Sequence, residues 1–187
     1  MLDGRTSPFD RVALDEVPIA AAALRPRPPA AAYIFRGRAP AQVAAATAFG
    51  LPLPQEACTS AEIGARAVLW LGPDEWQLLA PEAEAEAIQA AFAEHLAGTP
   101  HSLVPVGERN VAFEIEGPEA EAVLNAHCPL DLHITCFAIG MCTRTLYGKA
   151  EILLWRLGAQ RFYVGCWRSF LPYVWGLTRE ARLEYET

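Results

Sequence analysis

The sequence predicts an α+β fold made of internally duplicated strand–helix–hairpin–helix units, in which helices cover antiparallel sheet. The first observation is size, because 187 residues with 52% apolar side chains can bury one substantial core. The second is a pair of hairpin patterns, each with a helical pattern before and after it. The third is their spacing, because the same order of elements returns after roughly eighty residues. Two such units typically pack as one pseudo-symmetric α+β body.

The N-terminal region, residues 1–30, is expected to form an arm rich in Pro and Ala. Residues 20–29 read AAAALRPRPP, and repeated Pro disfavours both a regular helix and a central strand. We therefore place a single duplicated domain at residues 31–187. Its first half is expected at about residues 31–98 and its second half at about residues 109–184.

The first half is predicted from turn residues and hydrophobic periodicity. Residues 72–75 read GPDE and set a turn between two apolar runs, which predicts a hairpin. Gly50 follows a helical run, at the position where glycine commonly ends a helix. Pro81 stands where a first helical position tolerates proline. The expected elements are a strand at Tyr33–Arg36, a helix at Ala41–Phe49, strands at Ala67–Leu71 and Trp76–Ala80, and a helix at Pro81–Leu96.

The second half repeats this order. An aromatic residue begins the return strand of each hairpin, Trp76 in the first half and Phe162 in the second. Ser169 is expected to cap the closing helix, because its hydroxyl can accept a hydrogen bond from a free backbone N–H. The expected elements are a strand at Val111–Glu116, a helix at Glu119–Ala126, a short strand at Arg144–Leu146, strands at Glu151–Leu157 and Phe162–Trp167, and a helix at Ser169–Glu184.

The charge balance argues against a nucleic-acid partner. The formal net charge is −7, whereas nucleic-acid-binding proteins normally present a basic face. Basic side chains nevertheless gather in one stretch, at Arg144, Lys149, Arg156, Arg161 and Arg168. This stretch could meet an anionic partner or ligand, and a solvated basic face is the alternative.

The ends and the apolar runs of the sequence predict a cytoplasmic protein with no membrane partner. Residues 1–10 lack the apolar segment of a signal peptide, and no apolar run approaches the roughly 20 residues that span a bilayer. The five cysteines are odd in number and include no C-x-x-C pair. Reduced, mostly buried thiols are the expected state.

Motifs that would mark an active site are absent from the sequence. It contains no G-x-G-x-x-G, no G-x-x-x-x-G-K-[ST] and no G-x-S-x-G, which are the commonest dinucleotide, phosphate and serine-hydrolase signatures. One stretch is rich in zinc-ligand types, at His127, Cys128, His133, Cys136 and Cys142. Its spacing matches no common zinc pattern, so packing thiols are the favoured interpretation over a metal site.

Several runs together resemble one known family. They are WLGPDEWQLL at Trp70–Leu79, ERNVAFE at Glu108–Glu114, LNAHCPLDL at Leu124–Leu132, MCTRTLYGKAEILLW at Met141–Trp155 and CWRSFLPYVW at Cys166–Trp175. In order and spacing they resemble the gamma subunit of heterotetrameric sarcosine oxidase, over about residues 30–182. One departure is Glu108, where the family's pattern has His, and this puts a role for that position in doubt.

The resemblance implies a non-catalytic subunit of an oxidoreductase complex. The family's enzyme is an assembly of alpha, beta, gamma and delta subunits that oxidises sarcosine to glycine, passes the one-carbon unit to tetrahydrofolate and releases hydrogen peroxide. The resemblance places FAD, FMN, NAD and zinc in the other subunits and no catalytic, cofactor or metal residue in this chain. It also implies kinship with the folate-binding domain of aminomethyltransferases. The residues expected at the interface with other subunits are Arg109, Arg144, Arg156, Trp167 and Arg168.

Two other functions remain open from the residues alone. A stand-alone folate-binding protein could hold the glutamate tail of folate with the basic stretch at residues 144–168. An aminomethyltransferase would need a placed carboxylate for proton transfer, for which Asp131 is the best available residue. Because fold kinship does not carry function with it, the subunit role is the favoured hypothesis.

Overall fold

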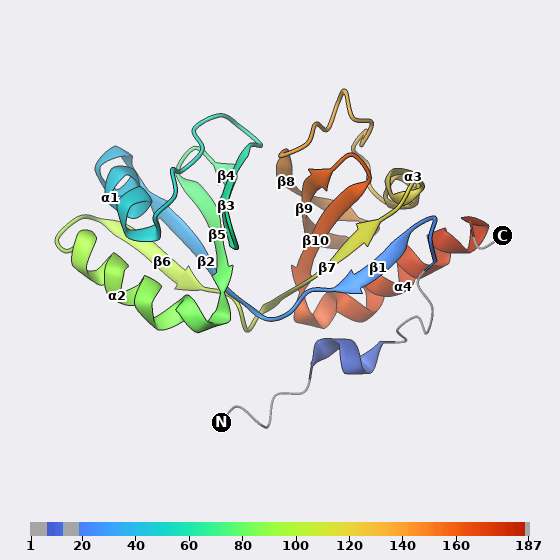
Figure 1. The fold of residues 1–187 in the computed structure, drawn as a ribbon, viewed down its shortest axis with the longest axis horizontal. Helices are drawn as coiled ribbons and strands as arrows, with labels where there is room; N and C mark the ends of the chain where they lie inside the picture. The colour runs from blue at the N-terminus through green and yellow to red at the C-terminus, as the bar shows by residue number, and fades with distance from the viewer. Residues whose placement is uncertain (1–6, 13–18, 186–187) are drawn as a thin grey trace. The chain divides into compact units, whose positions relative to one another are not determined.

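The computed structural model describes residues 7–12 and 19–185, which form two compact units (Figure 1). The first unit contains residues 29–108 and 140–143. The second contains the described residues up to 28, residues 109–139 and the chain from 144 onward. Each unit holds one five-stranded antiparallel sheet. The α+β class with antiparallel sheets is therefore confirmed, but the chain forms two compact units where the sequence predicts one domain.

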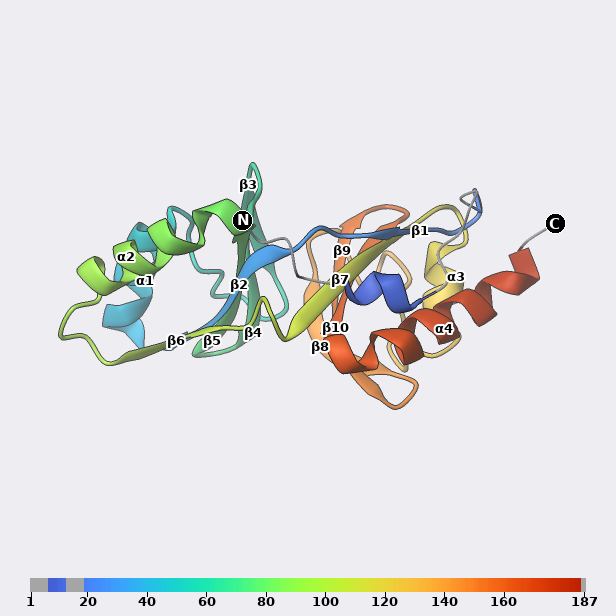
Figure 2. The ribbon, with the colours of Figure 1, turned by 90° about the horizontal axis from the view of Figure 1, so that it is seen from below.

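The first unit combines its sheet with two main helices. Its elements are β2 at Ala30–Gly37, α1 at Ala39–Phe49, β3 at Ser60–Ile63, β4 at Arg66–Gly72, β5 at Glu75–Pro81, η2 at Glu82–Glu84, α2 at Ala85–His95 and β6 at His101–Pro105. The strand order is β3-β4-β5-β2-β6, so the β4–β5 hairpin lies beside β2. Figure 2 shows α1 and α2 together on one side of this sheet. The other face of the sheet carries no helix of this unit.

The core of the first unit lies between the sheet and these helices. Tyr33 and Phe35 alternate with outward residues along β2 and are buried. The ring of Phe35 meets Phe92 of α2 edge-on at 5.8 Å and lies 6.0 Å from Trp76 of β5, measured between centroids. The indole N–H of Trp76 donates to the carbonyl oxygen of Pro54 at 2.8 Å. The largest side chain of this core is thus buried with its polar atom satisfied.

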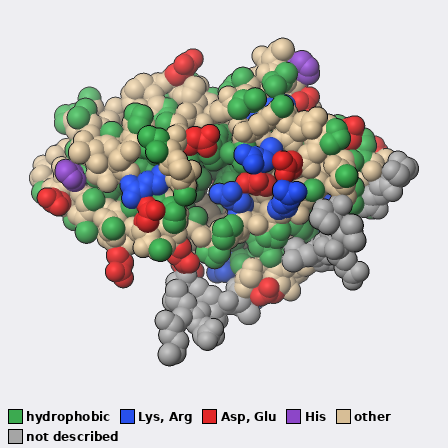
Figure 3. All heavy atoms as spheres, in the orientation of Figure 1, with side chains coloured by type: hydrophobic (Ala, Val, Ile, Leu, Met, Phe, Trp, Pro, Cys, Tyr) green, Lys and Arg blue, Asp and Glu red, His purple; other side chains and the backbone are tan. Residues whose placement is uncertain are grey.

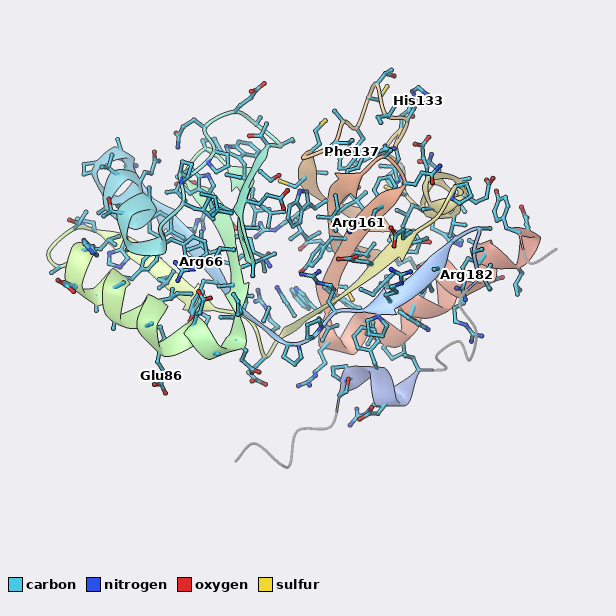
Figure 4. The ribbon with its side chains drawn as sticks, viewed as in Figure 1. Arg66, Glu86, His133, Phe137, Arg161 and Arg182 are labelled. Carbon is cyan, nitrogen blue, oxygen red and sulfur yellow. The ribbon has the colours of Figure 1, made fainter. Side chains whose placement is uncertain are left out.

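The end of α1 is stabilised by a glycine and an arginine. Gly50 has φ 76°, and its N–H donates to the carbonyl oxygen of Ala46 at 2.9 Å. The predicted glycine at the helix end is therefore confirmed. The guanidinium of Arg66 donates to the carbonyl of Phe49 and to Glu84, the latter at 2.6 Å (Figure 4). Because the last carbonyls of a helix are partly negative and lack partners within it, this cation stabilises the terminus.

The second unit has the same general construction. Its elements are η1 at Pro8–Arg11, β1 at Ala23–Pro26, β7 at Asn110–Glu116, α3 at Ala120–Asn125, β8 at Cys142–Tyr147 (whose first two residues belong to the first unit), β9 at Ala150–Gly158, β10 at Arg161–Trp167, η3 at Arg168–Phe170, α4 at Leu171–Arg182 and η4 at Leu183–Tyr185. The strand order is β1-β7-β10-β9-β8. Trp175 of α4 packs edge-on against Phe113 of β7 at 5.1 Å and against Phe9 of η1 at 5.5 Å. The closing helix is thereby fixed to the sheet.

The N-terminal region differs from the separate arm that the sequence predicts. Ala23–Pro26 forms β1, an edge strand antiparallel to β7. Proline is tolerated there because one side of an edge strand needs no ladder partner. Gly117 faces this segment, and a Cβ at that position would collide with the carbonyl oxygen of Ala21. Parts of the predicted arm, at residues 1–6 and 13–18, lie outside the described residues.

Other elements confirm or correct the predicted boundaries. Both predicted hairpins are present, and each observed strand contains the predicted one. Strands β3 and β6 were not predicted, and both lie at sheet edges. Pro81 is the last residue of β5 and not the first of a helix, because η2 separates it from α2. Ser169 lies inside η3, and α4 begins without a side-chain cap, so the predicted N-cap is wrong.

The cysteines are all free, and three of the five are buried. The thiol of Cys142 lies 3.3 Å from the carbonyl oxygen of Thr59 within the first unit. Burial raises the pKa of the Cys142 and Cys166 thiols to about 12 each. Because the thiolate is the reactive form, both residues should be inert at neutral pH. Cys136, by contrast, is exposed.

We expect Gly50→Ala to lower the free energy of unfolding by about 1 kcal/mol, because alanine is strained at a left-handed φ. Urea denaturation measures this. Gly176→Ala is the matched control, because Gly176 lies inside α4 with no atom near the added Cβ. It should stabilise the protein by about 0.5 to 1 kcal/mol. Equal effects of the two substitutions would contradict the assigned helix end.

We expect Cys136 to react first when the native protein meets a colorimetric disulfide reagent at mildly alkaline pH. Cys142 and Cys166 should react only on unfolding, because burial keeps their thiols protonated. Absorbance of the released thiolate follows the rate. Cys136→Ser should abolish the fast phase, and a fast phase that survives this substitution would mean that a second thiol is accessible.

Candidate partner interface

The five residues predicted at an interface fall in three different places. Three of them, Arg109, Trp167 and Arg168, lie together in the second unit. Arg144 is exposed on β8, and β9 separates that strand from β10, which carries Trp167. Arg156 is in the interior. The structure therefore brings together only part of the predicted set.

Arg156 is a buried residue of β9, with 2% of its surface exposed. Its guanidinium lies 4.6 Å from the centre of the Phe162 ring. It donates hydrogen bonds to five acceptors of the same unit, the carbonyl oxygens of Leu132 (2.6 Å), Phe137 (3.1 Å), Gly158 (3.2 Å) and Ala159, and Glu121 Oε2 (3.2 Å). A side chain held in this way stabilises the fold and presents no surface to a partner. The interface prediction is wrong for Arg156.

Trp167 and Phe170 form an exposed aromatic pair at the end of β10. Their rings stack with centroids 5.7 Å apart and planes inclined by 15°. Trp167 is 44% exposed and Phe170 is 38% exposed. The pairing of β10 with β7 puts Trp167 opposite Asn110 and so brings the preceding residue, Arg109, alongside. The pairing of β10 with β7 thus adds Arg109 to the aromatic pair, which the β9–β10 hairpin alone would not do.

Arg109 completes this surface. Its guanidinium lies 5.4 Å from the centre of the Trp167 ring, within the range of a cation–π contact. Its carbonyl oxygen accepts a hydrogen bond from the N–H of Arg168 at 2.8 Å. Tyr173, one helical turn beyond Phe170, is also exposed, and its hydroxyl accepts from the N–H of Lys149 at 3.1 Å. We call Arg109, Trp167, Arg168, Phe170 and Tyr173 the aromatic patch.

The aromatic patch has the composition of a protein–protein contact. Trp, Tyr and Arg are the residue types that most often dominate binding energy at interfaces. Large exposed aromatic groups that already stack on one another lose little side-chain freedom when a partner covers them. Arg109 and Arg168 add positive charge on a chain whose net charge is −7. The surface therefore fits a partner that offers apolar contact bordered by acidic groups.

The basic stretch at residues 144–168 does not expose all of its basic side chains. Arg156 is buried, while Arg144 on β8, Lys149 in the turn after it, Arg161 on β10 (Figure 4) and Arg168 in η3 are exposed. Figure 3 shows basic side chains beside acidic ones over the second unit. In that unit, Arg25 pairs with Glu116 at 2.8 Å and Arg27 pairs with Glu114 at 2.7 Å, each across neighbouring strands. Acidic side chains therefore accompany the basic ones on this unit, and the buried Arg156 is itself paired with Glu121.

The stretch rich in His and Cys does not converge on one point. His127 packs edge-on against Tyr147 at 5.4 Å, His133 Nδ1 lies 2.8 Å from the hydroxyl of Thr135, and Cys142 lies in the core. Across residues 7–12 and 19–185, no group of three or more His, Cys, Asp or Glu could hold a metal ion. Within the same ranges, no helix is both long and apolar enough to cross a membrane.

Asp131 lies on an exposed loop and makes local contacts. Its carboxylate accepts from the N–H of His133 at 2.9 Å. This hydrogen bond is the main reason that the pKa of the Asp131 carboxyl lies below its usual value, and a hydrogen bond with the thiol of Cys136 adds to the effect. A carboxylate with a lowered pKa is a weaker proton acceptor, so its setting does not favour general-base catalysis.

Comparison with known proteins identifies the family. The model of the sarcosine oxidase, gamma subunit family matches residues 36–184. The sarcosine oxidase subunit gamma of Arthrobacter sp. is 39% identical over 124 residues, which is 65% of this chain and 59% of that protein. The protein of the same name from Corynebacterium sp. (strain P-1) is 35% identical over 122 residues, again 59% of its length. The match thus spans less than two thirds of these curated relatives.

Solved structures agree with this assignment. A chain of heterotetrameric sarcosine oxidase from Corynebacterium sp. U-96, in complex with pyrrole 2-carboxylate, superposes with a TM-score of 0.88 at 27% identity, over 98% of this chain and 97% of that one. Aminomethyltransferase T of the glycine cleavage system from Bartonella henselae gives a TM-score of 0.64 at 14% identity, over 85% of this chain and 45% of that one, and shows the shared fold alone. The predicted fold kinship is confirmed, and the chain belongs to the sarcosine oxidase gamma subunit family.

Proposed function

We propose that this chain is a non-catalytic subunit of a heterotetrameric sarcosine oxidase and acts by docking to the other subunits. The supporting observation is the aromatic patch, in which Arg109, Trp167 and Phe170 stack on one another at the surface of the second unit. It lies on a chain that superposes over almost its whole length on a chain of such an oxidase. A subunit role requires a stable exposed contact surface, and the patch has the composition and rigidity of one.

The chemistry belongs, in this proposal, to the alpha, beta and delta subunits. The complex would oxidise sarcosine to glycine, pass the one-carbon unit to tetrahydrofolate and release hydrogen peroxide, with FAD, FMN, NAD and zinc held by the partner subunits. The gamma chain would brace the large subunits and help to enclose the route between the oxidation site and the folate site. Assembly in the cytoplasm, expected from the sequence, is part of the same proposal.

A stand-alone folate-binding function has weaker support. It depends on fold kinship and on a continuous basic surface in residues 144–168. The fold kinship to aminomethyltransferase T is at 14% identity and carries no function by itself. The predicted basic surface is incomplete, since Arg156 is buried and makes its hydrogen bonds within the fold. No described feature therefore favours this function over the subunit role.

We expect Trp167→Ala to weaken assembly with the alpha, beta and delta subunits on the order of 10- to 100-fold, because a central aromatic contact would be lost. Reconstitution from purified subunits, followed by size-exclusion chromatography, measures this. Val43→Ala is the control. Val43 is an apolar residue of α1 that is 72% exposed, and it belongs to the first unit, whereas the aromatic patch belongs to the second. This variant should assemble like the wild-type chain.

The wild-type reconstitution tests the proposed function itself. If the wild-type chain joins no complex at micromolar concentration, the subunit role fails. If it assembles and Trp167→Ala assembles equally well, the subunit role stands but the aromatic patch is not the contact. Calorimetry of the isolated chain with tetrahydrofolate tests the stand-alone folate-binding function, because a saturable heat of binding would favour it.

A further inference from the structure

A long loop that begins in the second unit is held in place by the buried Arg156. Residues 126–141 run from the end of α3 to the start of β8 without helix or strand. Loops of this length inside a compact unit are uncommon and usually carry function. Figure 1 shows this loop extending past the ends of the neighbouring strands, and Figure 4 shows His133 and Phe137 on it. We call residues 130–139 the anchored loop.

The anchor is the guanidinium of Arg156. It donates to the carbonyl oxygens of Leu132 and Phe137, five residues apart on the anchored loop, at 2.6 and 3.1 Å. The side chains of Leu132 and Phe137 are buried beneath the loop. Between them a turn closes, because the carbonyl oxygen of His133 accepts from the N–H groups of Cys136 and Phe137 at 2.8 Å each. The loop is therefore fixed at Leu132, at Phe137 and across the turn between them.

Two isoleucines remain exposed on this fixed loop. Ile134 is 40% exposed and Ile139 is 57% exposed, although both are β-branched apolar side chains that normally gain from burial. Because the backbone beneath them is already ordered, a partner that covered them would not have to order the loop first. Rigid exposed apolar side chains on a loop of this kind are typical of binding elements.

The charge of the anchored loop differs from that of the aromatic patch. Asp131 is exposed, and its carboxylate is kept ionised by the N–H of His133 and the thiol of Cys136. The nearby Glu121 is partly exposed, but its Oε2 lies 3.2 Å from the Arg156 guanidinium, which compensates its charge, so Asp131 carries the negative charge of the loop. The aromatic patch carries Arg109 and Arg168 instead. Charge complementarity therefore favours a basic partner surface opposite the loop and an acidic partner surface opposite the aromatic patch.

We propose that the anchored loop is a second docking element, whose Ile134 and Ile139 enter an apolar pocket with a basic rim on a partner subunit. This inference rests on the proposed function, because it takes the occupant from the heterotetramer. It goes beyond that function by assigning the loop, the two anchoring side chains and the chemistry of the surface they meet. Arg156 is in this account a positioning residue, which acts on the partner only through the loop.

The direct test is a double substitution on the exposed side chains. Ile134→Asp with Ile139→Asp should weaken assembly with the alpha, beta and delta subunits by about tenfold or more, since two apolar contacts become charges. Both side chains are exposed, so the melting temperature of the variant should equal that of the wild-type chain. Val43→Asp with Ile63→Asp is the matched control, because these are exposed apolar residues of the first unit. It should assemble normally.

The outcomes separate this inference from the proposed function. If the wild-type chain does not assemble, the proposed function has failed. If the wild-type chain and the loop variant assemble with equal affinity, the docking role of the loop is overturned while the subunit role stands. Asp131→Asn tests the basic rim, because it should weaken assembly and flatten its dependence on salt concentration. An unchanged salt dependence would contradict a basic rim.

Discussion

The β9–β10 turn and the anchored loop of the second unit depend on Arg156, one of two buried arginines among the described residues of that unit. The guanidinium of Arg156 sits among apolar residues of the sheet, where transfer of a charge from water costs several kcal/mol unless its hydrogen bonds are replaced. The unit replaces them with four carbonyl oxygens, one carboxylate and the face of the Phe162 ring. Removing the guanidinium would leave these acceptors short of a donor, at a loss of about 3–5 kcal/mol. The same bonds hold the β9–β10 turn and the anchored loop in place.

The sequence predicted best those elements whose signals are local. Both hairpins were found because turn residues and apolar runs mark them within a few positions, and the end of α1 was found because Gly50 is needed at a positive φ. Strands β1, β3 and β6 were missed. All three are sheet edges, with short or exposed sequences and, in β1, a proline. Their position comes from pairing with distant segments, which local periodicity does not report.

The candidate site was predicted in part for a similar reason. Charge and residue type singled out Arg109, Trp167 and Arg168, which do gather at the surface, but also Arg156, which does not. A usable signal existed for Arg156, since Ile152, Leu154 and Arg156 share one face of β9 and pair with Cys166, Val164 and Phe162. Phe170, Ile134 and Ile139 were missed, because exposure of an apolar side chain depends on tertiary packing. The internal repeat stays a prediction, although the strand orders β3-β4-β5-β2-β6 and β8-β9-β10-β7-β1 correspond place by place.

The central proposal is that this chain works as a subunit of a flavin-bearing complex. The most direct measurement is a pull-down of the tagged chain from its native cells grown on a methylated glycine, with an absorbance spectrum of the eluate. The account predicts a yellow eluate that contains a large flavin-bearing partner. A colourless eluate that contains this chain alone would contradict it.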